Sequence, residues 1–297
     1  MESTGVYWKP IYNLLEDEFT LLLVNAQHIK AVPGRKTDVK DAEWIAELLR
    51  HGLVRGSFVP DRSQRELRDM IRYRRSLIDQ RSQVINRIQK VLEGANIKLS
   101  SVATDITGVS GRSILEAMIS GVEDPKVLAD MAKARLRKKR ASLEEALNGL
   151  FGTTQRTLIA SQLRHLDFLD SEIAQLSDNI SGRTEHLEES IQRLDTIPGV
   201  GRQTAEEILI EIGTDMSRFA TAQHLASWAR VCPGNNESAG KHRSVVLVMG
   251  TIGFALHLSR HHGLQLEPSI IIWLPYIIAL LIAGEKSVPF WRLVTVF

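Results

Sequence analysis

The stretch that decides the fold is residues 62–93, RSQRELRDMIRYRRSLIDQRSQVINRIQKVLE. Its apolar residues recur at every third or fourth position, a spacing that places them on one face of an α-helix. Because the pattern runs through the whole stretch, it predicts one long helix. The residues that carry the apolar face are Leu67, Ile71, Leu77 or Ile78, Ile85, Ile88 and Leu92.

Positive charge gathers on the same stretch. Between residues 62 and 90 there are eight arginines and one lysine against three acidic residues. A helix this basic suits a polyanion or an acidic neighbour, although a solvated charged face is an equally good interpretation. A second basic helix is predicted at 132–142, AKARLRKKRAS, and it favours nucleic acid. The predicted nucleic-acid contacts in the two segments are Arg68, Arg72, Arg75, Arg137, Lys138 and Lys139.

A heptad-like apolar pattern follows in residues 154–194. Its spacing of three and four residues is interrupted near Gly182 and then resumes in phase. Such a pattern seeks a partner helix, either within the chain or from a second copy. We therefore expect a coiled coil and a homodimer or tetramer. The residues of the pattern are Leu166, Leu169, Ile173, Leu176 and Ile180, then Leu187, Ile191 and Leu194.

The amino-terminal part reads as an α/β unit. Residues 6–16 are predicted to form a short helix, and residues 19–26, FTLLLVNA, a buried strand. A second helix is expected over residues 37–50, and Asp38 and Asp41 lie at its start. Two acidic residues there suit the positive end of the helix dipole, which is the favoured interpretation of this stretch taken alone. The alternative is that both carboxylates face a divalent cation. Strand followed by helix favours α/β organisation.

Residues 194–213, LDTIPGVGRQTAEEILIEIG, place a Gly-Val-Gly turn directly before a helix. A glycine-rich turn lets backbone N–H groups approach a phosphate, and the helix dipole favours the anion. The segment resembles the hairpin of helix-hairpin-helix DNA-binding modules, although a plain turn is an alternative. Gly199, Gly201 and Arg202 are its predicted nucleic-acid contacts.

Residues 226–244, ASWARVCPGNNESAGKHRS, place Ser238 in a loop rich in glycine, asparagine and cationic residues. In this setting a hydroxyl could be activated and a phosphate held, although such composition is usually that of an ordinary loop. Lys241 and Arg243 are the predicted nucleic-acid contacts of this loop.

The composition bounds the class of protein. With 297 residues, 43% of them apolar and 24% charged, the chain is globular. Its single cysteine, Cys232, cannot form an internal disulfide, which favours a reducing, intracellular setting. The start of the chain lacks the pattern of a signal peptide. Residues 269–284 are apolar, but Pro275 interrupts them and they are short of the roughly 20 residues that cross a membrane. We expect a cytoplasmic protein.

Four segments in order resemble the DEDD-type insertion-sequence transposases that a bridge RNA guides. They are Met1-Glu2-Ser3-Thr4-Gly5, then VNAQHIKAVPGRKTDVKDAEWIAELL at 24–49, LDTIPGVGRQTA at 194–205 and WARVCPGNNESAGKHRS at 228–244. The resemblance covers residues 1–244, and the ordered set is far more specific than any one segment.

The resemblance implies an α/β plus mostly α fold in four parts. Residues 1–60 would form a partial RNase-H-like (RuvC-type) domain, and residues 61–193 the basic helices and a coiled-coil linker. Residues 194–244 would form a small helical carboxy-terminal transposase domain with the hairpin and the serine loop. Residues 245–297 are an atypical apolar tail.

The resemblance also implies the chemistry and the partners. Glu2, Asp38 and Asp41 would be metal-side catalytic carboxylates that hold Mg²⁺ or Mn²⁺, and Ser238 would be the nucleophile. The implied reaction is strand cleavage and transfer at the ends of an insertion sequence. DNA and a bridge RNA would be the partners, with no small-molecule substrate, in the cytoplasm of a prokaryote at the nucleoid.

The chain departs from the family pattern in two places. The first aspartate of the family lies on a strand upstream of the residue that matches Glu2, and the chain begins one residue before Glu2. After Ser244 the sequence loses the basic helical character of the family's ending. We therefore expect a truncated copy. The alternatives to an active transposase are an inactive copy that only binds nucleic acid and a protein that resembles a junction nuclease.

Overall fold

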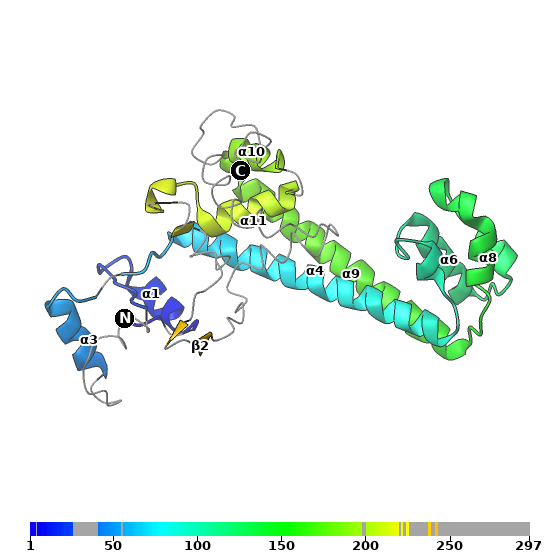
Figure 1. Ribbon diagram of the computed structural model, residues 1–297, viewed down its shortest axis with the longest axis horizontal. Helices are drawn as coiled ribbons and strands as arrows, with labels where there is room; N and C mark the ends of the chain where they lie inside the picture. The colour runs from blue at the N-terminus through cyan, green and yellow to red at the C-terminus, as the bar shows by residue number, and fades with distance from the viewer. Residues whose placement is uncertain are drawn as a thin grey trace. The chain divides into compact units, whose positions relative to one another are not determined.

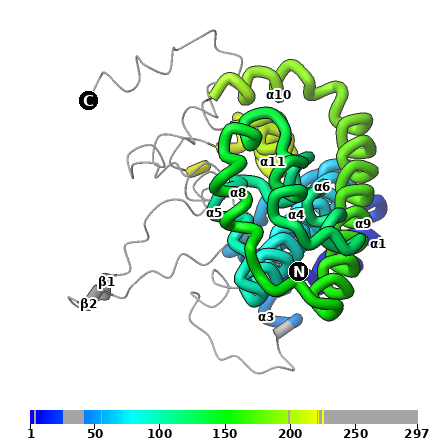
Figure 2. Tube along the Cα trace, turned by 90° about the vertical axis from the view of Figure 1, so that its right-hand side faces the viewer, coloured from blue at the N-terminus to red at the C-terminus, as the bar shows by residue number. Residues whose placement is uncertain are grey.

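The computed structural model describes most of the first 225 residues and one short hairpin. The described residues are 1–3, 5–25, 41–54, 56–197, 200–219, 221, 224–225, 237–238 and 241–242. They are mostly helical, and the chain divides into two compact units, Met1–Glu66 and Leu67–Phe297 (Figures 1 and 2). Each unit is described by itself, and the four-part division expected from the sequence stays a prediction.

The first unit contains helices α1 (Trp8–Leu15) and α3 (Asp41–Arg50) and a small meeting point of extended chain. Val24 forms a parallel bridge with Glu2 and an antiparallel bridge with Gly56. Val24 N donates to Met1 O at 2.8 Å, and Ser3 N donates to Val24 O at 2.8 Å. The buried side chains beside this point are Val24 and Leu48, packed with Trp44, Ile45 and Val54.

The strand expected over residues 19–26 is largely wrong within the described residues. Residues 20–25 form no continuous ladder, and only Val24 makes bridges. Within the described residues, Glu2 and Gly56 each form one bridge with Val24, so the pairing covers a single position and does not make a strand. Phe19 is accordingly 59% exposed, although its apolar character had placed it in a buried strand.

The second unit is organised around two long helices, α4 (Arg62–Gly94, which begins in the first unit) and α9 (Thr153–Arg183). Leu67 and Ile71 near the start of α4 pack with Ile180 near the end of α9. Farther along, Arg81 Nε donates to Asp170 Oδ1. Residue numbers rise along one helix as they fall along the other, so the two helices are antiparallel (Figure 1).

Helix α4 confirms the long helix predicted over residues 62–93. Helix α9 ends at Arg183, next to the interruption expected near Gly182. The apolar pattern of α9 lies in the same cluster as the apolar face of α4, so α4 supplies the partner helix from within the chain. The expected association of copies stays a prediction.

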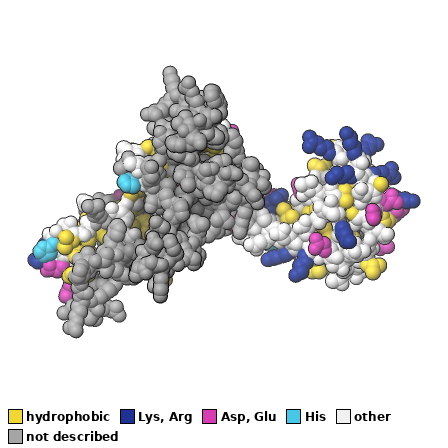
Figure 3. Space-filling model, viewed as in Figure 1, with side chains coloured by type: hydrophobic (Ala, Val, Ile, Leu, Met, Phe, Trp, Pro, Cys, Tyr) yellow, Lys and Arg dark blue, Asp and Glu magenta, His cyan; other side chains and the backbone are white. Residues whose placement is uncertain are grey.

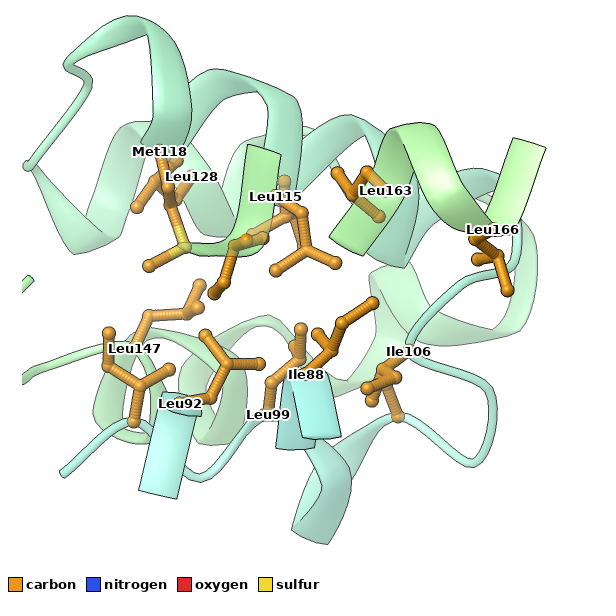
Figure 4. Packing of buried hydrophobic residues seen from close by; sticks show 14 of the residues in the cluster. Ile88, Leu92, Leu99, Ile106, Leu115, Met118, Leu128, Leu147, Leu163 and Leu166 are labelled. Carbon is orange, nitrogen blue, oxygen red and sulfur yellow. The ribbon is translucent and has the colours of Figure 1, made fainter. Parts of the chain in front are cut away.

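The connecting segment, residues 95–152, joins the end of α4 to the start of α9 and shares their core (Figure 4). Its main helix, α6 (Val109–Ser120), is held on α9 by Arg112, whose guanidinium donates two hydrogen bonds to Asp167 of α9, at 2.7 and 2.8 Å. The helices of this segment are α5 (Leu99–Val102), α6 (Val109–Ser120), α7 (Pro125–Asp130), the 3₁₀ helix η2 (Ala134–Lys139) and α8 (Arg140–Ala146).

The basic segment at 132–142 is not the single α-helix that its sequence predicts. Lys133 is extended, Ala134 has a left-handed φ of 49°, and η2 runs into α8 at Arg140. A left-handed residue cannot continue a right-handed helix, so no helix can extend back through Ala134 toward Ala132.

The described residues that follow α9 have a small core of their own around Leu194, Ile208 and Leu209. A short antiparallel hairpin, β1 (Glu237–Ser238) with β2 (Lys241–His242), is also described. The helices here are η3 (Glu185–Leu187), α10 (Glu188–Asp195), α11 (Arg202–Ile212) and η4 (Met216–Arg218).

Among the helices in the part of the chain that the structure describes, none is both long and apolar enough to span a bilayer. The apolar stretch at 269–284 lies outside the described residues.

Gly111 of α6 sits where no side chain fits. A Cβ there would lie 2.2 Å from Ile106 O, a backbone atom that cannot rotate away. We expect Gly111→Ala to lower the free energy of unfolding by about 2–3 kcal/mol, because overpacking a rigid site has this cost.

Thermal unfolding followed by circular dichroism measures the effect. Gly182→Ala in α9 is the control, since a Cβ there meets nothing within 4 Å. It should raise stability by about 0.5 kcal/mol through helix propensity. Equal stability of the two variants would contradict the close packing of α6 on residue 106.

Candidate functional site

The structure describes only some of the three predicted metal-binding carboxylates, Glu2, Asp38 and Asp41. Glu2 is half-buried on the extended segment whose backbone pairs with Val24. Asp41 is the first residue of α3, while Asp38 and the side chain of Asp41 lie outside the described residues. Among the side chains that the structure does describe, no three His, Cys, Asp or Glu residues group to hold a metal ion. The metal site stays a prediction.

Ser238 lies in the hairpin formed by β1 and β2. The register pairs Ser238 with Lys241 and Glu237 with His242. The candidate nucleophile, Ser238, and a predicted nucleic-acid contact, Lys241, are therefore paired across the two strands of the hairpin backbone. Arg243 lies outside the described residues, and the roles of Ser238, Lys241 and Arg243 stay predictions.

The arginines of α4 face an acidic helix. Arg72 makes a two-pronged contact with Glu211 of α11, with Nε to Oε1 at 2.8 Å and Nη2 to Oε2 at 2.9 Å. Arg75 Nη1 donates to Glu207 Oε2 at 3.2 Å. Arg68 Nε donates to Ile210 O at 3.2 Å, and Arg68 Nη2 donates to Glu211 O. We call this contact between α4 and α11 the arginine–glutamate face.

At the centre of this face lies a buried ion pair. The side chain of Arg74 is 2% exposed, that of Glu206 is 4% exposed, and Arg74 Nη1 donates to Glu206 Oε2 at 3.1 Å. Arg74 Nη2 lies 3.9 Å from Glu207 Oε1. Burial raises the pKa of Glu207, an effect that outweighs the neighbouring Arg75 and Arg74.

These contacts show what the arginines of α4 face within the chain. Of the two partners that suit so basic a helix, the acidic neighbour is present, and Arg68, Arg72 and Arg75 all contact it. The acidic residues of α11 are the signal that sequence reasoning missed: Glu207 and Glu211 stand four residues apart on one helix face, a spacing matched to the arginines, and Glu206 lies beside them. Nucleic-acid contact by these three arginines stays a prediction.

The turn before α11 is described in part. Gly201 is the N-cap of α11 with extended backbone, and Ala205 N donates to Gly201 O at 2.9 Å. Gly199 lies outside the described residues. Arg202 is held by acidic residues of the same chain, since its Nη1 and Nη2 donate to Glu188 at 2.7 and 2.6 Å. Nucleic-acid contact by Gly199, Gly201 and Arg202 stays a prediction.

The basic residues of η2 differ from those of α4, since most of them lack a protein partner within the described residues. Arg137 and Lys138 are exposed and make no ion pair within the described chain, and Lys139 Nζ reaches only Val102 O there, at 3.3 Å. Lys and Arg side chains gather on this part of the surface (Figure 3). Lys133 and Arg135, which the sequence did not single out, belong to the same run.

Comparison with known families identifies the class of protein. A sequence model of DEDD transposases of the IS110 type matches residues 1–97, and the model of the "Transposase IS116/IS110/IS902 family" matches residues 191–247. Together the matches extend over slightly more than half of the chain, and both define transposases. The chain belongs to the IS116/IS110/IS902 family.

Two relatives agree with this assignment. The pilin gene-inverting protein of Moraxella bovis is 40% identical over 70 residues, which is 24% of this chain and 20% of that protein. The transposase for insertion sequence element IS1111A of Coxiella burnetii (strain RSA 493 / Nine Mile phase I) is 25% identical over 228 residues, which is 74% of this chain and 52% of that protein. The chain thus spans a fifth and about half of the lengths of these relatives.

The buried pair at the centre of the arginine–glutamate face gives a stability prediction. Glu206→Gln leaves the buried Arg74 without the carboxylate that accepts its hydrogen bond. We expect the free energy of unfolding to fall by about 3 kcal/mol, since removing one partner of a buried ion pair has this cost.

Urea unfolding followed by circular dichroism provides the measurement. Glu189→Gln makes the same chemical change at a side chain that is 81% exposed and paired with Arg193. It should have little effect, because solvent screens exposed pairs. If both variants unfold at the wild-type urea concentration, the Arg74–Glu206 pair does not hold α11 on α4.

A second prediction concerns pH. Hydrogen bonds from Arg202, and next from Gln192, lower the pKa of Glu188 from 4.5 to about 2. A lowered pKa means that this pair stabilises the fold above the ordinary pKa and stops doing so as the pH falls toward 2. Carbon-13 NMR of the Glu188 carboxyl should therefore show a midpoint near pH 2.

In Arg202→Met the Glu188 midpoint should move up toward 4.5, short of it because Gln192 still donates. Arg193→Met changes an arginine paired with Glu189 instead and should leave the midpoint in place. If the titration midpoint of Glu188 is the same in Arg202→Met as in the wild type, Arg202 is not the residue that lowers the pKa of Glu188.

Proposed function

We propose that this chain is a DNA transposase that cuts and joins strands at the ends of an insertion sequence, with a serine nucleophile. One observation carries the proposal: both sets of candidate catalytic residues fall inside family-matched segments. Glu2, Asp38 and Asp41 lie within residues 1–97, and Ser238 lies within residues 191–247. The relatives are named for inverting a pilin gene and for transposing an insertion sequence, and we extend DNA rearrangement to this chain.

Three carboxylates are a suitable donor set for a hard divalent cation such as Mg²⁺ or Mn²⁺. Glu2 stands on the extended segment bonded to Val24, and α3 begins at Asp41. These two elements would belong to a partial RNase-H-like domain at residues 1–60. When bound, the cation would polarise the scissile phosphate and stabilise the charge that develops on it.

Ser238 would attack the phosphorus of the scissile phosphodiester. A bond forms between Ser238 Oγ and phosphorus while the bond between phosphorus and the leaving strand's oxygen breaks. The proton released by the serine hydroxyl ends on that oxygen, and the other strand end stays linked to Ser238. Attack by a hydroxyl of a different strand then releases the serine and joins the strands. Lys241, opposite Ser238 in the hairpin, is suited to attract the phosphate.

The partners follow from the same resemblance. A bridge RNA would select the DNA, and two or four copies would bring the strands together. The antiparallel pair formed by α4 and α9 would serve as the coiled-coil linker between the two catalytic parts. Arg243 of the serine loop and the hairpin residues Gly199, Gly201 and Arg202 would contribute nucleic-acid contacts.

The proposal is tested by trapping the covalent intermediate. The full chain is incubated with Mg²⁺, a labelled duplex carrying the end of the insertion sequence that encodes it, and RNA transcribed from the adjoining noncoding DNA. We expect a protein–DNA adduct that survives denaturing electrophoresis. It should disappear in Ser238→Ala, in Asp38→Asn, Asp41→Asn and Glu2→Gln, and on addition of EDTA.

Ser244→Ala, a change at another serine of the same loop, is the control and should retain the adduct. An adduct that persists in Ser238→Ala would mean that another residue is the nucleophile. A wild-type chain that shifts the labelled duplex on a native gel but never forms the adduct would be a binding protein, and the enzymatic proposal would fail.

A further inference from the structure

A cavity of about 770 Å³ opens in the connecting segment, between residues 102–110 and residues 133–139. Neither family model matches this part of the chain, since the matches end at residue 97 and resume at residue 191. None of the catalytic residues proposed above lines the cavity.

The lining of this cavity is strongly cationic. Lys133, Arg135 and Lys139 line it, against a single carboxylate from Asp105. That carboxylate already accepts hydrogen bonds from Thr107 N at 2.9 Å and from Thr107 Oγ1 at 2.8 Å. Within the described chain, the side chains of Lys133 and Arg135 make no ion pair and are exposed. Positive charge held together without a protein partner attracts an anion.

The cationic rim is fixed in place. Lys133 N donates to Ser110 Oγ of α6 at 2.9 Å, and Leu136 N donates to Lys133 O at 3.1 Å. Ala134, between the two cations, adopts a left-handed φ of 49°, a conformation that L-residues rarely adopt. Lys133 and Arg135 both line the cavity on either side of this turn. A fixed rim loses less entropy on binding than a flexible one.

The rim continues into a longer row of charge. Arg137 and Lys138 follow on η2, are exposed and make no ion pair within the described chain. We call Lys133, Arg135, Arg137 and Lys138 the basic row. A single small anion would neutralise only part of this row, whereas a polymer with regularly spaced phosphates would meet all of it.

The lining also indicates which part of a nucleic acid would bind. It contains no aromatic residue among the described side chains, so it offers no platform for stacking unpaired bases. Contacts from lysine and arginine to phosphates position a duplex without reading its sequence. The chemistry favours a double-stranded nucleic acid held by its backbone.

We propose that the cavity and the basic row bind the sugar–phosphate backbone of a double-stranded nucleic acid, independently of sequence. The site rests on the proposed function and deepens it by adding a binding surface for its nucleic-acid partner. It uses neither Ser238 nor the three carboxylates.

The test measures binding by fluorescence anisotropy, with the full chain, in EDTA and at several salt concentrations. The probes are a labelled 30-base-pair DNA duplex of arbitrary sequence and an RNA duplex of the same sequence. The variant is Lys133→Ala/Arg135→Ala/Arg137→Ala. We expect it to bind about tenfold more weakly at 0.1 M salt, and the salt dependence to flatten by about one unit of slope for each phosphate that the variant no longer neutralises.

The matched control is Lys90→Ala/Lys126→Ala/Arg164→Ala, which removes three exposed cations from outside the cavity and the basic row. If it weakens binding as much as the test variant, the effect is one of net charge and the proposal is overturned. Binding of the test variant at wild-type affinity would also overturn it. A loss of affinity confined to the DNA or to the RNA duplex identifies the partner, and a loss on both identifies the shared backbone.

Thermal unfolding should be unchanged in both triple variants, because all six side chains are exposed. Ser238→Ala separates the two proposals, since it should bind both duplexes like the wild type while forming no covalent adduct. If the wild type forms no covalent adduct but the test variant still binds the duplexes more weakly, only the catalytic proposal fails. If the wild type forms the adduct but the test variant binds at wild-type affinity, only the binding-site proposal fails.

Discussion

The packing of α4 against α9 is the constraint on which the second unit depends. Neither helix can remain alone in water, because each carries an apolar face along most of its length. Their pairing buries that face and also sets the ends between which the connecting segment must fold. The helices of that segment contribute Leu115, Met118 and Leu128 to the same cluster (Figure 4), so the pair and the segment share one core.

Charge has two distinct uses on this framework. On α4 the arginines meet glutamates of α11 and hold two helices together. On η2 the cations have an open cavity beside them and few protein partners within the described residues. Both runs look alike in the sequence, since each is simply rich in arginine and lysine. What separates them is a neighbour distant in sequence, which only the folded chain reveals.

The sequence predicted the long helices well and the short elements poorly. Leu67, Ile71, Ile88 and Leu92 repeat over enough turns that the helical period of α4 is unmistakable, and its ends agree with those predicted to within one residue. The strand at 19–26 failed because whether an apolar run pairs as a strand depends on partner segments far away in the chain. The residues of η2 were expected as α-helix, and the left-handed backbone at Ala134 left no signal in composition. For the site, motif resemblance pointed to Glu2 and Ser238, whereas Lys133 and Arg135 emerged only from the shape of a cavity.

The arginine–glutamate face also determines the register of α11 on α4. Arg68, Arg72 and Arg75 repeat at nearly one helical turn, as do Glu207 and Glu211, so these pairs alone would tolerate a slide of one turn. Arg74 and Glu206 have no such repeat within the face. A slide would separate these two buried charges and break their hydrogen bond in a site that excludes water, at a cost of several kcal/mol. The more exposed pairs thus supply attraction, and the buried pair selects one alignment from those that the attraction would permit.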